Sequence, residues 1–366
     1  MRHVYQAVIG MSCLFYWLSQ PLVFVLVLGA AGGLIYLCFA IGHIPIYLIL
    51  ALVVGTLSTM AAMLRGMFTR PKDEDPGLPL ELASEPRFAA LLDEVAKRVG
   101  TRPVDTLYLT PGTDLAVMER GTLFRQMSGR ANRCLILGVG VLDGLTLGPF
   151  KSILAHEYGH FSNKDTSGGQ LALAVRRSLH TTAAQLVEDG NAKWFNPAWL
   201  FLYGFYKVFL RISQGASRLQ EVMADRWAAF LYGTDAFKAG LGHVVRRAIE
   251  FQAYASASIE EVAQARQPLP NLYAHRPVQK IDHAAIDEEF KKTIAREPSP
   301  YDSHPSTAHR FAWVEALGVP SVPEPHDQQA VWSLFDGREA IETRLTEQVR
   351  HNLLSQGIEL PKPPVV

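Results

Sequence analysis

Two long apolar stretches near the N-terminus constrain the fold of this chain more than any other feature. Neither Pro21–Ala40 nor Ile44–Leu64 contains a charged side chain. A helix needs about 20 apolar residues to cross about 30 Å of hydrocarbon, so each stretch is long enough. A buried core helix seldom runs this far without a charge, and a cleaved signal peptide would not be followed at once by a second run. We therefore expect a transmembrane helical hairpin over residues 21–64.

The residues that flank the hairpin predict its orientation. Arg65, Arg70 and Lys72 follow the second stretch, and the positive-inside rule places such a cluster in the cytoplasm. Because a hairpin returns the chain to the side it came from, everything after residue 64 is expected there. Residues 1–20 are expected to lie along the membrane interface, with a third span as the alternative. Residues 65–80 are rich in proline and charge, and they are typical of a linker.

Composition excludes several classes of partner. The 366 residues carry 35 basic and 35 acidic side chains, so no global field attracts nucleic acid, and the bilayer is the expected non-protein partner. Cys13, Cys38 and Cys134 are an odd number of thiols without a Cys-x-x-Cys pair. They indicate neither a disulfide framework nor a redox site.

After the linker the patterns predict helices with a few short strands. Apolar residues recur at helical spacing from Glu81 to Gly100, and helical patterns dominate again from Ser152 to about residue 255. Short strands are expected at Val104–Leu109 and Cys134–Val141, with an exposed one at Asp114–Met118. We expect one domain over residues 81–320. A C-terminal tail over 321–366 would hold one amphipathic helix at Arg338–Leu353.

An aromatic segment, Trp194–Ile212, leaves two interpretations open. Pro197 interrupts its start, and Lys207 and Arg211 lie inside it, so a further full span is not favoured. A helix that rests on the bilayer or packs in the core fits the amphipathic rings better.

The pattern with the most chemical content is His156-Glu157-Tyr158-Gly159-His160, an H-E-x-x-H motif. Side chains four residues apart lie on one face of a helix, so both imidazoles can approach one ion. Zinc accepts imidazole nitrogen and tolerates an open position in catalytic sites. Glu157 follows the first histidine and is expected to act as general base on a metal-activated water. The bland alternative is a helix with two unconnected histidines.

A third ligand is expected from a later helix, and Glu221 is the candidate. Glu221 and Asp225 share a helix face on a largely apolar stretch, where a carboxylate is costly unless it is paired or bound to a metal. With Glu221 as ligand, Asp225 would hydrogen-bond the second nitrogen of a ligand histidine. The alternative is an ordinary exposed face of ion-pairing residues.

Three motifs together resemble a known family. They are HEYGHFSNKD at 156–165, SRLQEVMADRWAA at 217–229 and DSHPSTAHR at 302–310, in that order after apolar spans. The chain resembles the HtpX-like membrane zinc metallopeptidases, a family related to the CAAX prenyl proteases. The resemblance implies an α+β, mostly helical fold, with a transmembrane helical hairpin followed by a gluzincin-like metallopeptidase domain with a small sheet. It also implies one Zn²⁺ per chain, held by His156, His160 and Glu221.

The resemblance implies further roles by position. His304 matches a histidine that steadies the oxyanion of the tetrahedral intermediate, and Arg310 closes the same motif and would orient or pair within it. The alternative for His304 is a loop histidine beside a turn proline. Asp114, Leu115, Ala116 and Val117 fall where relatives place an edge strand that binds substrate backbone. This sequence reads Asp-Leu-Ala-Val-Met there, unlike the Asn-Ala-Phe-Ala of many relatives.

The predicted function is therefore a membrane-anchored, zinc-dependent endopeptidase. It would cleave unfolded or membrane-associated proteins at the cytoplasmic face of the cell membrane, in protein quality control. Processing of prenylated peptides is disfavoured, because one hairpin cannot build the multi-span cage of the CAAX prenyl proteases. The alternative is a non-catalytic zinc-binding chaperone, or holdase, or a scaffold. Glu157 speaks against it, since a structural site needs four ligands and no general base. A membrane sensor ranks last, because no sensor domain is recognisable.

Overall fold

The structure is a computed structural model that describes residues 2–42, 44–68, 75–121, 125, 128–162, 166–299, 302, 304–321 and 323–361. The chain divides into two compact units. Unit 1 comprises Met1–Asp73, Thr166–Leu219 and Ser299–His304, and unit 2 comprises Glu74–Asp165, Gln220–Pro298 and Pro305–Val366. Each is described by itself.

Unit 1 is a bundle of long helices. Its members are α1 (Arg2–Ala40), α2 (Ile46–Phe68), α6 (Thr166–Glu188) and the first part of α7 (Pro197–Tyr232). Helix α1 passes through Pro21 without a break, so the expected N-terminal segment 1–20 is the first half of a longer helix. Its position in the interface stays a prediction.

The apolar helices α1 and α2 are long and apolar enough to cross a membrane, by length and composition. Only 17% of each apolar window is buried, whereas a core helix of a soluble protein is mostly buried. Large apolar side chains are instead exposed along both helices, from Met11 on α1 to Phe68 on α2. These two helices support association with a membrane.

Aromatic side chains of α1 and α7 pack together inside unit 1. Tyr16 is fully buried, and its hydroxyl lies 2.8 Å from the Ser178 hydroxyl of α6. Its ring packs on Phe201 and Phe205 of α7, and Phe205 stacks on Phe209. The aromatic segment 194–212 thus packs in a core on one side, while the other side of α7 exposes large apolar residues.

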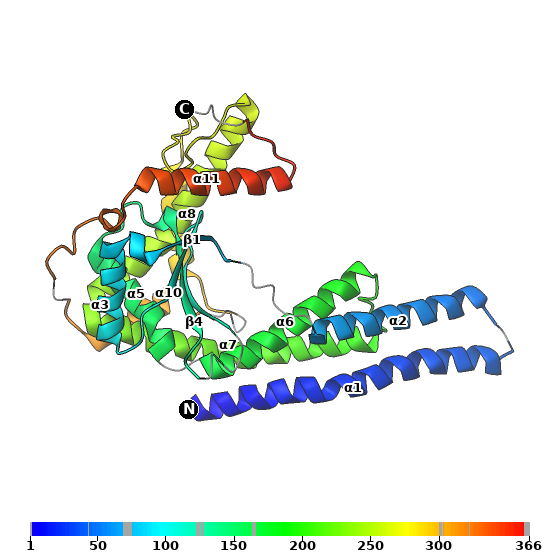
Figure 1. Ribbon diagram of the computed structural model, residues 1–366. Coiled ribbons are helices and arrows are strands. Elements are labelled where there is room, and N and C mark those ends of the chain that lie inside the picture. Colours follow the sequence, from blue (N-terminus) through cyan, green and yellow to red (C-terminus); the bar gives the residue numbers. More distant parts are fainter. Residues whose placement is uncertain are drawn as a thin grey trace. The chain divides into compact units, whose positions relative to one another are not determined.

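Unit 2 contains a small sheet with strand order β1-β2-β4-β3 (Figure 1). The strands are β1 (Leu78–Leu80), β2 (Thr106–Thr110), β3 (Leu115–Arg120) and β4 (Asn132–Gly138). Strands β2 and β4 are parallel, and the other pairs are antiparallel. The exposed strand expected near residues 114–118 is therefore β3, at an edge of the sheet.

The helices of unit 2 enclose one apolar core with this sheet. They are α3 (Pro86–Val99), α5 (Leu147–Ser162), the end of α7, α8 (Thr234–Ala265), α9 (His283–Ala295), α10 (Thr307–Leu317) and α11 (Arg338–Ser355), with short 3₁₀ turns at Leu82–Ser84, Val139–Val141 and Val331–Leu334. The α+β, mostly helical class expected from the family resemblance is confirmed. Ile341 and Leu345 of α11 lie in the core, so the residues expected to form a C-terminal tail are part of this unit.

The C-terminal segment also completes the start of the H-E-x-x-H helix. The first amide groups of a helix have no partner inside it. In α5, Leu147 N–H donates to the Gln329 carbonyl at 2.9 Å, and Gly148 N–H donates to the Asp327 carbonyl at 3.0 Å. The buried Lys151 of α5 pairs with Glu324 at 2.8 Å and with Asp327 at 3.2 Å. Residues 324–329 thereby fix the position of α5.

Gly138 and Gly140 occupy positions where a larger residue would clash with its neighbours. A Cβ at Gly138 would lie 2.5 Å from the Gly112 carbonyl oxygen, and one at Gly140 would lie 2.8 Å from the Phe251 ring. Both distances are well inside van der Waals contact. The glycines allow the end of β4 to pass against the loop that leads into β3, and so they position the edge strand.

Candidate active site

The H-E-x-x-H residues lie on α5 as the helical spacing predicts. The rings of His156 and His160 are 4.9 Å apart between centroids, and His156 is buried. Tyr158, between them in the sequence, faces the core: it is 1% exposed, and its hydroxyl accepts a hydrogen bond from Val104 N–H. Packing of this opposite face fixes the rotation of α5 about its axis and turns both imidazoles the other way.

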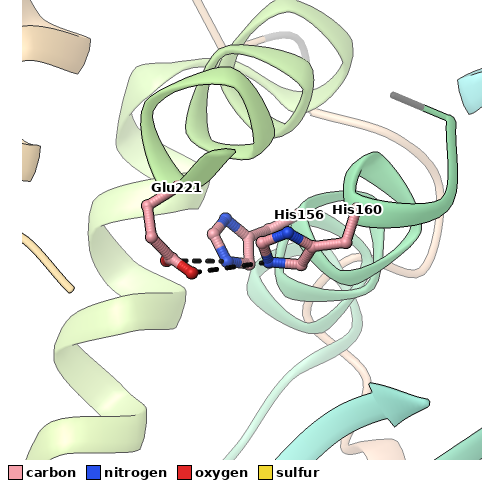
Figure 2. Close-up of side chains that lie close together, drawn as sticks. All are labelled: His156, His160 and Glu221. Atoms are coloured by element: carbon pink, nitrogen blue, oxygen red, sulfur yellow. Dashed lines mark ion pairs between the residues drawn. The ribbon is translucent and has the colours of Figure 1, made fainter. Parts of the chain in front are cut away.

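Glu221 of α7 faces the two histidines (Figure 2). Its carboxylate oxygens lie 3.5 Å from Nε2 of His156 and 3.6 Å from Nε2 of His160. The three ligand atoms lie within 4.8 Å of one another. Glu221, which follows His160 by 61 positions in the sequence, thus lies beside the motif in space.

A close helix contact explains this proximity. A Cβ at Gly159 of α5 would lie 3.1 Å from Cα of Ala224 and 3.3 Å from its Cβ. Ala224 is fully buried, and it lies three residues after Glu221 on α7. Small residues on both helices therefore let the two backbones approach. Sequence analysis missed both positions, and the only available signal was their size and their place inside the two motifs.

The donor set fits a zinc ion. Two imidazole nitrogens and one carboxylate are ligands that catalytic zinc accepts, with bonds of about 2.0–2.2 Å. Around a tetrahedral ion such bonds separate two ligand atoms by about 3.4 Å. The 3.5 and 3.6 Å separations between the Glu221 oxygens and the two Nε2 atoms are close to this value.

Asp225 contacts the second ring nitrogen of His156, and Arg310 pairs with Asp225. Asp225 Oδ1 lies 2.9 Å from Nδ1 of His156. The Arg310 guanidinium of α10 donates to both oxygens of Asp225, from Nε at 2.9 Å and from Nη2 at 2.5 Å. All three side chains are buried. Arg310 therefore pairs with the second motif, a partner that the sequence did not predict.

Glu157 lies next to the edge strand. Its Oε2 accepts a hydrogen bond of 3.2 Å from the backbone N–H of Val117 in β3. The Asp114 carbonyl accepts a hydrogen bond from Gly138 N–H at the end of β4. Backbone groups alternate sides along a strand, so the N–H of Val117, three residues later, points away from β4. The carboxylate and the free side of the strand thus meet at one place.

Contacts within this cluster raise the pKa of His156 and lower the pKa values of Glu221 and Asp225. Burial by itself lowers the pKa of His156, but hydrogen bonds to Asp225 and Glu221 outweigh it and raise the value to about 9. Burial alone would raise the pKa of Glu221, yet contact with His156 and the charge of Arg310 lower it to about 2. Asp225 is held below its usual pKa in the same way by His156 and Arg310. A dication at this point would compete with the proton on His156.

Glu157 differs from these two carboxylates. Burial raises the pKa of Glu157 to about 7, with a smaller opposing effect from the charge of His156. A carboxyl group with a pKa near neutrality can both take up and release a proton under physiological conditions.

The other predicted residues belong to the start of β3 and to the Ser299–His304 segment. Asp114 is exposed and precedes β3, where its carbonyl accepts a hydrogen bond from Gly138 N–H, while Leu115 and Ala116 begin the strand. His304 is exposed and belongs to the Ser299–His304 segment of unit 1. Arg218 of α7, also in unit 1, donates to the carbonyls of Ser299 and Asp302 and thereby ties that segment to α7.

A helix that carries His-Glu-x-x-His, with a glutamate from a later helix facing both histidines, is the arrangement of a metallopeptidase site. The sequence matches peptidase family M48 over residues 128–317, slightly more than half of the chain. The chain belongs to this family. Its two apolar helices support association with a membrane.

Comparison with solved structures finds the crystal structure of Ste24p from S. mikatae. The two chains share 14% identity over 81% of this chain, with a TM-score of 0.31. This chain spans 65% of the length of that protein. Such a TM-score does not define a shared architecture, so the family membership rests on the sequence match. No curated protein sequence matches the chain.

Proposed function

We propose that this chain is a membrane-anchored, zinc-dependent endopeptidase of the HtpX-like type, which cleaves unfolded or membrane-associated proteins at the cytoplasmic face of the membrane. The observation that carries the proposal is the meeting of His156, His160 and Glu221 within 4.8 Å, with the Glu157 carboxylate beside an edge strand. The two spans rest on the length of the apolar stretches, and the cytoplasmic side rests on the positive charges that follow the hairpin. Quality control rests on the family resemblance alone.

In this proposal His156, His160 and Glu221 hold the zinc ion. The ion, when bound, supplies Lewis acidity to a substrate carbonyl and lowers the pKa of a coordinated water. Asp225 keeps the proton of His156 on Nδ1 and thus presents Nε2 as the ligand atom. Arg310 balances the negative charge of Asp225 in a buried setting.

Glu157 is the proposed general base and acid. It removes a proton from the attacking water and later delivers it to the leaving amine nitrogen. A pKa near 7 suits both transfers. The Val117 N–H holds the carboxylate toward the strand, and so it orients Glu157 relative to a peptide lying there.

The free side of β3 is the proposed substrate-binding edge. Strand pairing supplies backbone donors and acceptors without regard to side chains, which suits a protease of broad specificity. Asp114, Leu115, Ala116 and Val117 would contact the substrate backbone. The oxyanion role of His304 is carried over from the resemblance, and a donor of this kind is worth about 3–4 kcal/mol at the transition state.

The test compares purified, zinc-loaded wild type with Glu157→Gln on casein, a loosely folded substrate. We expect equal zinc content and a loss of at least about 100-fold in cleavage, because the amide cannot act as a base. Glu339→Gln, an exposed residue of α11, is the matched control and should cleave normally.

Two outcomes would contradict the proposal. If both zinc-loaded proteins bind one equivalent of zinc and neither cleaves casein or a membrane protein, the holdase alternative is favoured. If wild type binds no zinc, the proposed metal site is wrong.

A further inference from the structure

Contacts between the helices of unit 1 place their residues at common levels along the bundle. On α6 and α7, Arg176 donates to Ser213 at 2.9 Å, so these residues share one level. A Cβ at Gly66 of α2 would meet Thr182 and the Ser178 carbonyl of α6, and Tyr16 of α1 meets Ser178. These contacts set Tyr16, Gly66, Ser178 and Ser213 at about the same level of the bundle.

Basic residues gather at this level. Within about 10 Å along the bundle axis, at 1.5 Å per helical residue, lie five cations. We call them the basic belt, and its members are Arg65, Arg176, Arg177, Lys207 and Arg211. The acidic side chains of unit 1 that the structure describes are Glu188 and Asp189 at the far end of α6 and Asp302 outside the helices.

The belt combines exposed and partly buried cations. Arg177, Lys207 and Arg211 are exposed, while Arg176 is half-buried with Nε shielded from water and without a hydrogen-bond partner. The positive charges gathered at this level, with the buried and unpartnered Nε donor of Arg176 among them, favour an anionic ligand with several acceptor oxygens.

The distance from the belt to the hairpin tip matches a bilayer. From Arg65 to Ile46, where α2 begins, the helix rises over 19 residues, or about 29 Å at the helical rise. The hydrocarbon core is about 30 Å thick. Figure 1 shows that α1 and α2 continue beyond the turn between α6 and α7 and carry the hairpin tip alone.

We propose that the basic belt lies in the headgroup region of the bilayer and binds the phosphates of anionic lipids, so that the membrane surface crosses unit 1 at this level. The positive-inside bias makes this the cytoplasmic leaflet. The inference does not depend on peptidase activity.

One consequence concerns the α6–α7 turn. Asp189 lies 12 residues beyond Arg177, so the turn reaches about 18 Å into the hydrocarbon as a half-span. Its polar groups bond to α2: Ser58 donates to Asp189 at 2.6 Å, and Asn196 donates to Thr59 at 3.0 Å. Trp194, which is 81% exposed, would face lipid.

The competing placement sets this turn at the membrane surface. It spares Glu188, Asp189 and Lys193 the cost of entering hydrocarbon, about 2.5–3.5 kcal/mol for each charge at the centre. However, only Leu28–Ala40 of α1 would then enter the bilayer, which is about 20 Å and too short to cross it. It would also expose apolar residues of α7 to water, namely Leu200, Tyr203, Tyr206 and Val208.

The first experiment measures lipid preference. The full chain is reconstituted in phosphatidylcholine with spin-labelled phosphatidylglycerol or spin-labelled phosphatidylcholine, and the immobilised fraction of each is compared. Wild type should prefer the anionic lipid, and the triple change Arg177→Gln, Lys207→Gln, Arg211→Gln should lower that preference at least about fivefold. The matched control, Lys280→Gln, Lys291→Gln, Arg344→Gln, removes three exposed cations of unit 2 and should leave it unchanged. An equal loss of lipid preference in both triple variants, or no loss in the first, would overturn the proposal that the basic belt binds anionic lipids.

The second experiment measures depth. In full chains with the three native cysteines changed to alanine, spin labels are placed by Trp194→Cys, Arg177→Cys, Leu34→Cys and Val278→Cys. The proposal expects the label at 194 to resemble that at 34, accessible to oxygen and shielded from a water-soluble nickel chelate, with the label at 177 intermediate. A label at 194 as accessible to nickel as that at 278, which is 90% exposed in unit 2, would place the turn outside the bilayer and refute the proposal.

Discussion

Gly159→Ala should separate metal affinity from stability, because Gly159 sets the distance between α5 and α7. The added Cβ would lie 3.1 Å from Cα of Ala224, whereas carbon atoms at contact prefer about 3.5–4.0 Å. The two backbones must therefore part by roughly 0.5 Å. Glu221 moves with α7, and the histidines stay with α5.

The expected magnitudes follow from this displacement. Alanine gains about 1 kcal/mol over glycine in a helix, and overpacking costs about 1–3 kcal/mol, so the net loss of stability should stay below about 2 kcal/mol. A metal site needs its ligands placed within about 0.5 Å, and 1 Å of misplacement costs about 100-fold in rate. We expect zinc affinity and kcat/KM each to fall about tenfold.

The assay is zinc titration against a chromophoric chelator, with casein cleavage and urea denaturation measured on the same samples. Gly242→Ala is the control, because Gly242 lies within α8 and no atom lies within 4 Å of its Cβ position. It should gain up to about 1 kcal/mol and keep its zinc affinity. If Gly159→Ala binds zinc and cleaves like wild type, the close contact with Ala224 does not position Glu221.

Three further changes test the surroundings of the site. Asp225→Asn should weaken zinc binding about 10–100-fold and cost up to about 3–5 kcal/mol in urea denaturation, because it removes the nearer carboxylate of the buried Arg310 and leaves only Glu221 at 3.6 Å to balance its charge; an unchanged zinc affinity would contradict the orienting role. Removal of zinc by a chelator should lower the Tm, and readdition at 100 times the Kd should restore about 2.7 kcal/mol, a gain that His156→Ala should lack. Hydrogen bonds from Lys151 and Arg98 outweigh burial and lower the pKa of Glu324 in the folded state, so its contribution is present above the ordinary value of 4.5 and is lost as pH falls. Burial lowers the pKa of Lys151, but contact with Glu324 outweighs it and raises the value. The contribution of Lys151 to stability is therefore lost only as pH rises above 10.5. Glu324→Gln should therefore flatten the acid side of the curve of stability against pH, and an unaltered acid side would show that this pair does not stabilise the fold.

Local sequence determined the elements that carry the chemistry. The four-residue spacing of His156 and His160 fixes them to one face of any helix, and the same holds for Glu221 and Asp225. The length of the apolar stretches likewise predicted α1 and α2, since a span is defined by its own residues and the bilayer. The functional roles of these residues, and of His304, stay predictions.

Only the tertiary structure decided how these elements meet. No local sequence pattern predicts that Arg310 of the third motif pairs with Asp225 of the second, or that α11 joins the core of unit 2. The strand order that leaves β3 at an edge depends on pairings between residues far apart in the chain. Contacts of this kind depend on the shapes of both partners, so one sequence pattern cannot specify them alone.

The joining of the two metal motifs shows the difference most clearly. The sequence determined which side chains could bind a metal, because ligand chemistry belongs to each residue and helical spacing is a local property. The structure determined that they do meet, because the approach of α5 to α7 depends on the missing side chain of Gly159 and the small one of Ala224. An absent side chain has no periodicity or charge to read, and its effect appears only when a second helix packs against it.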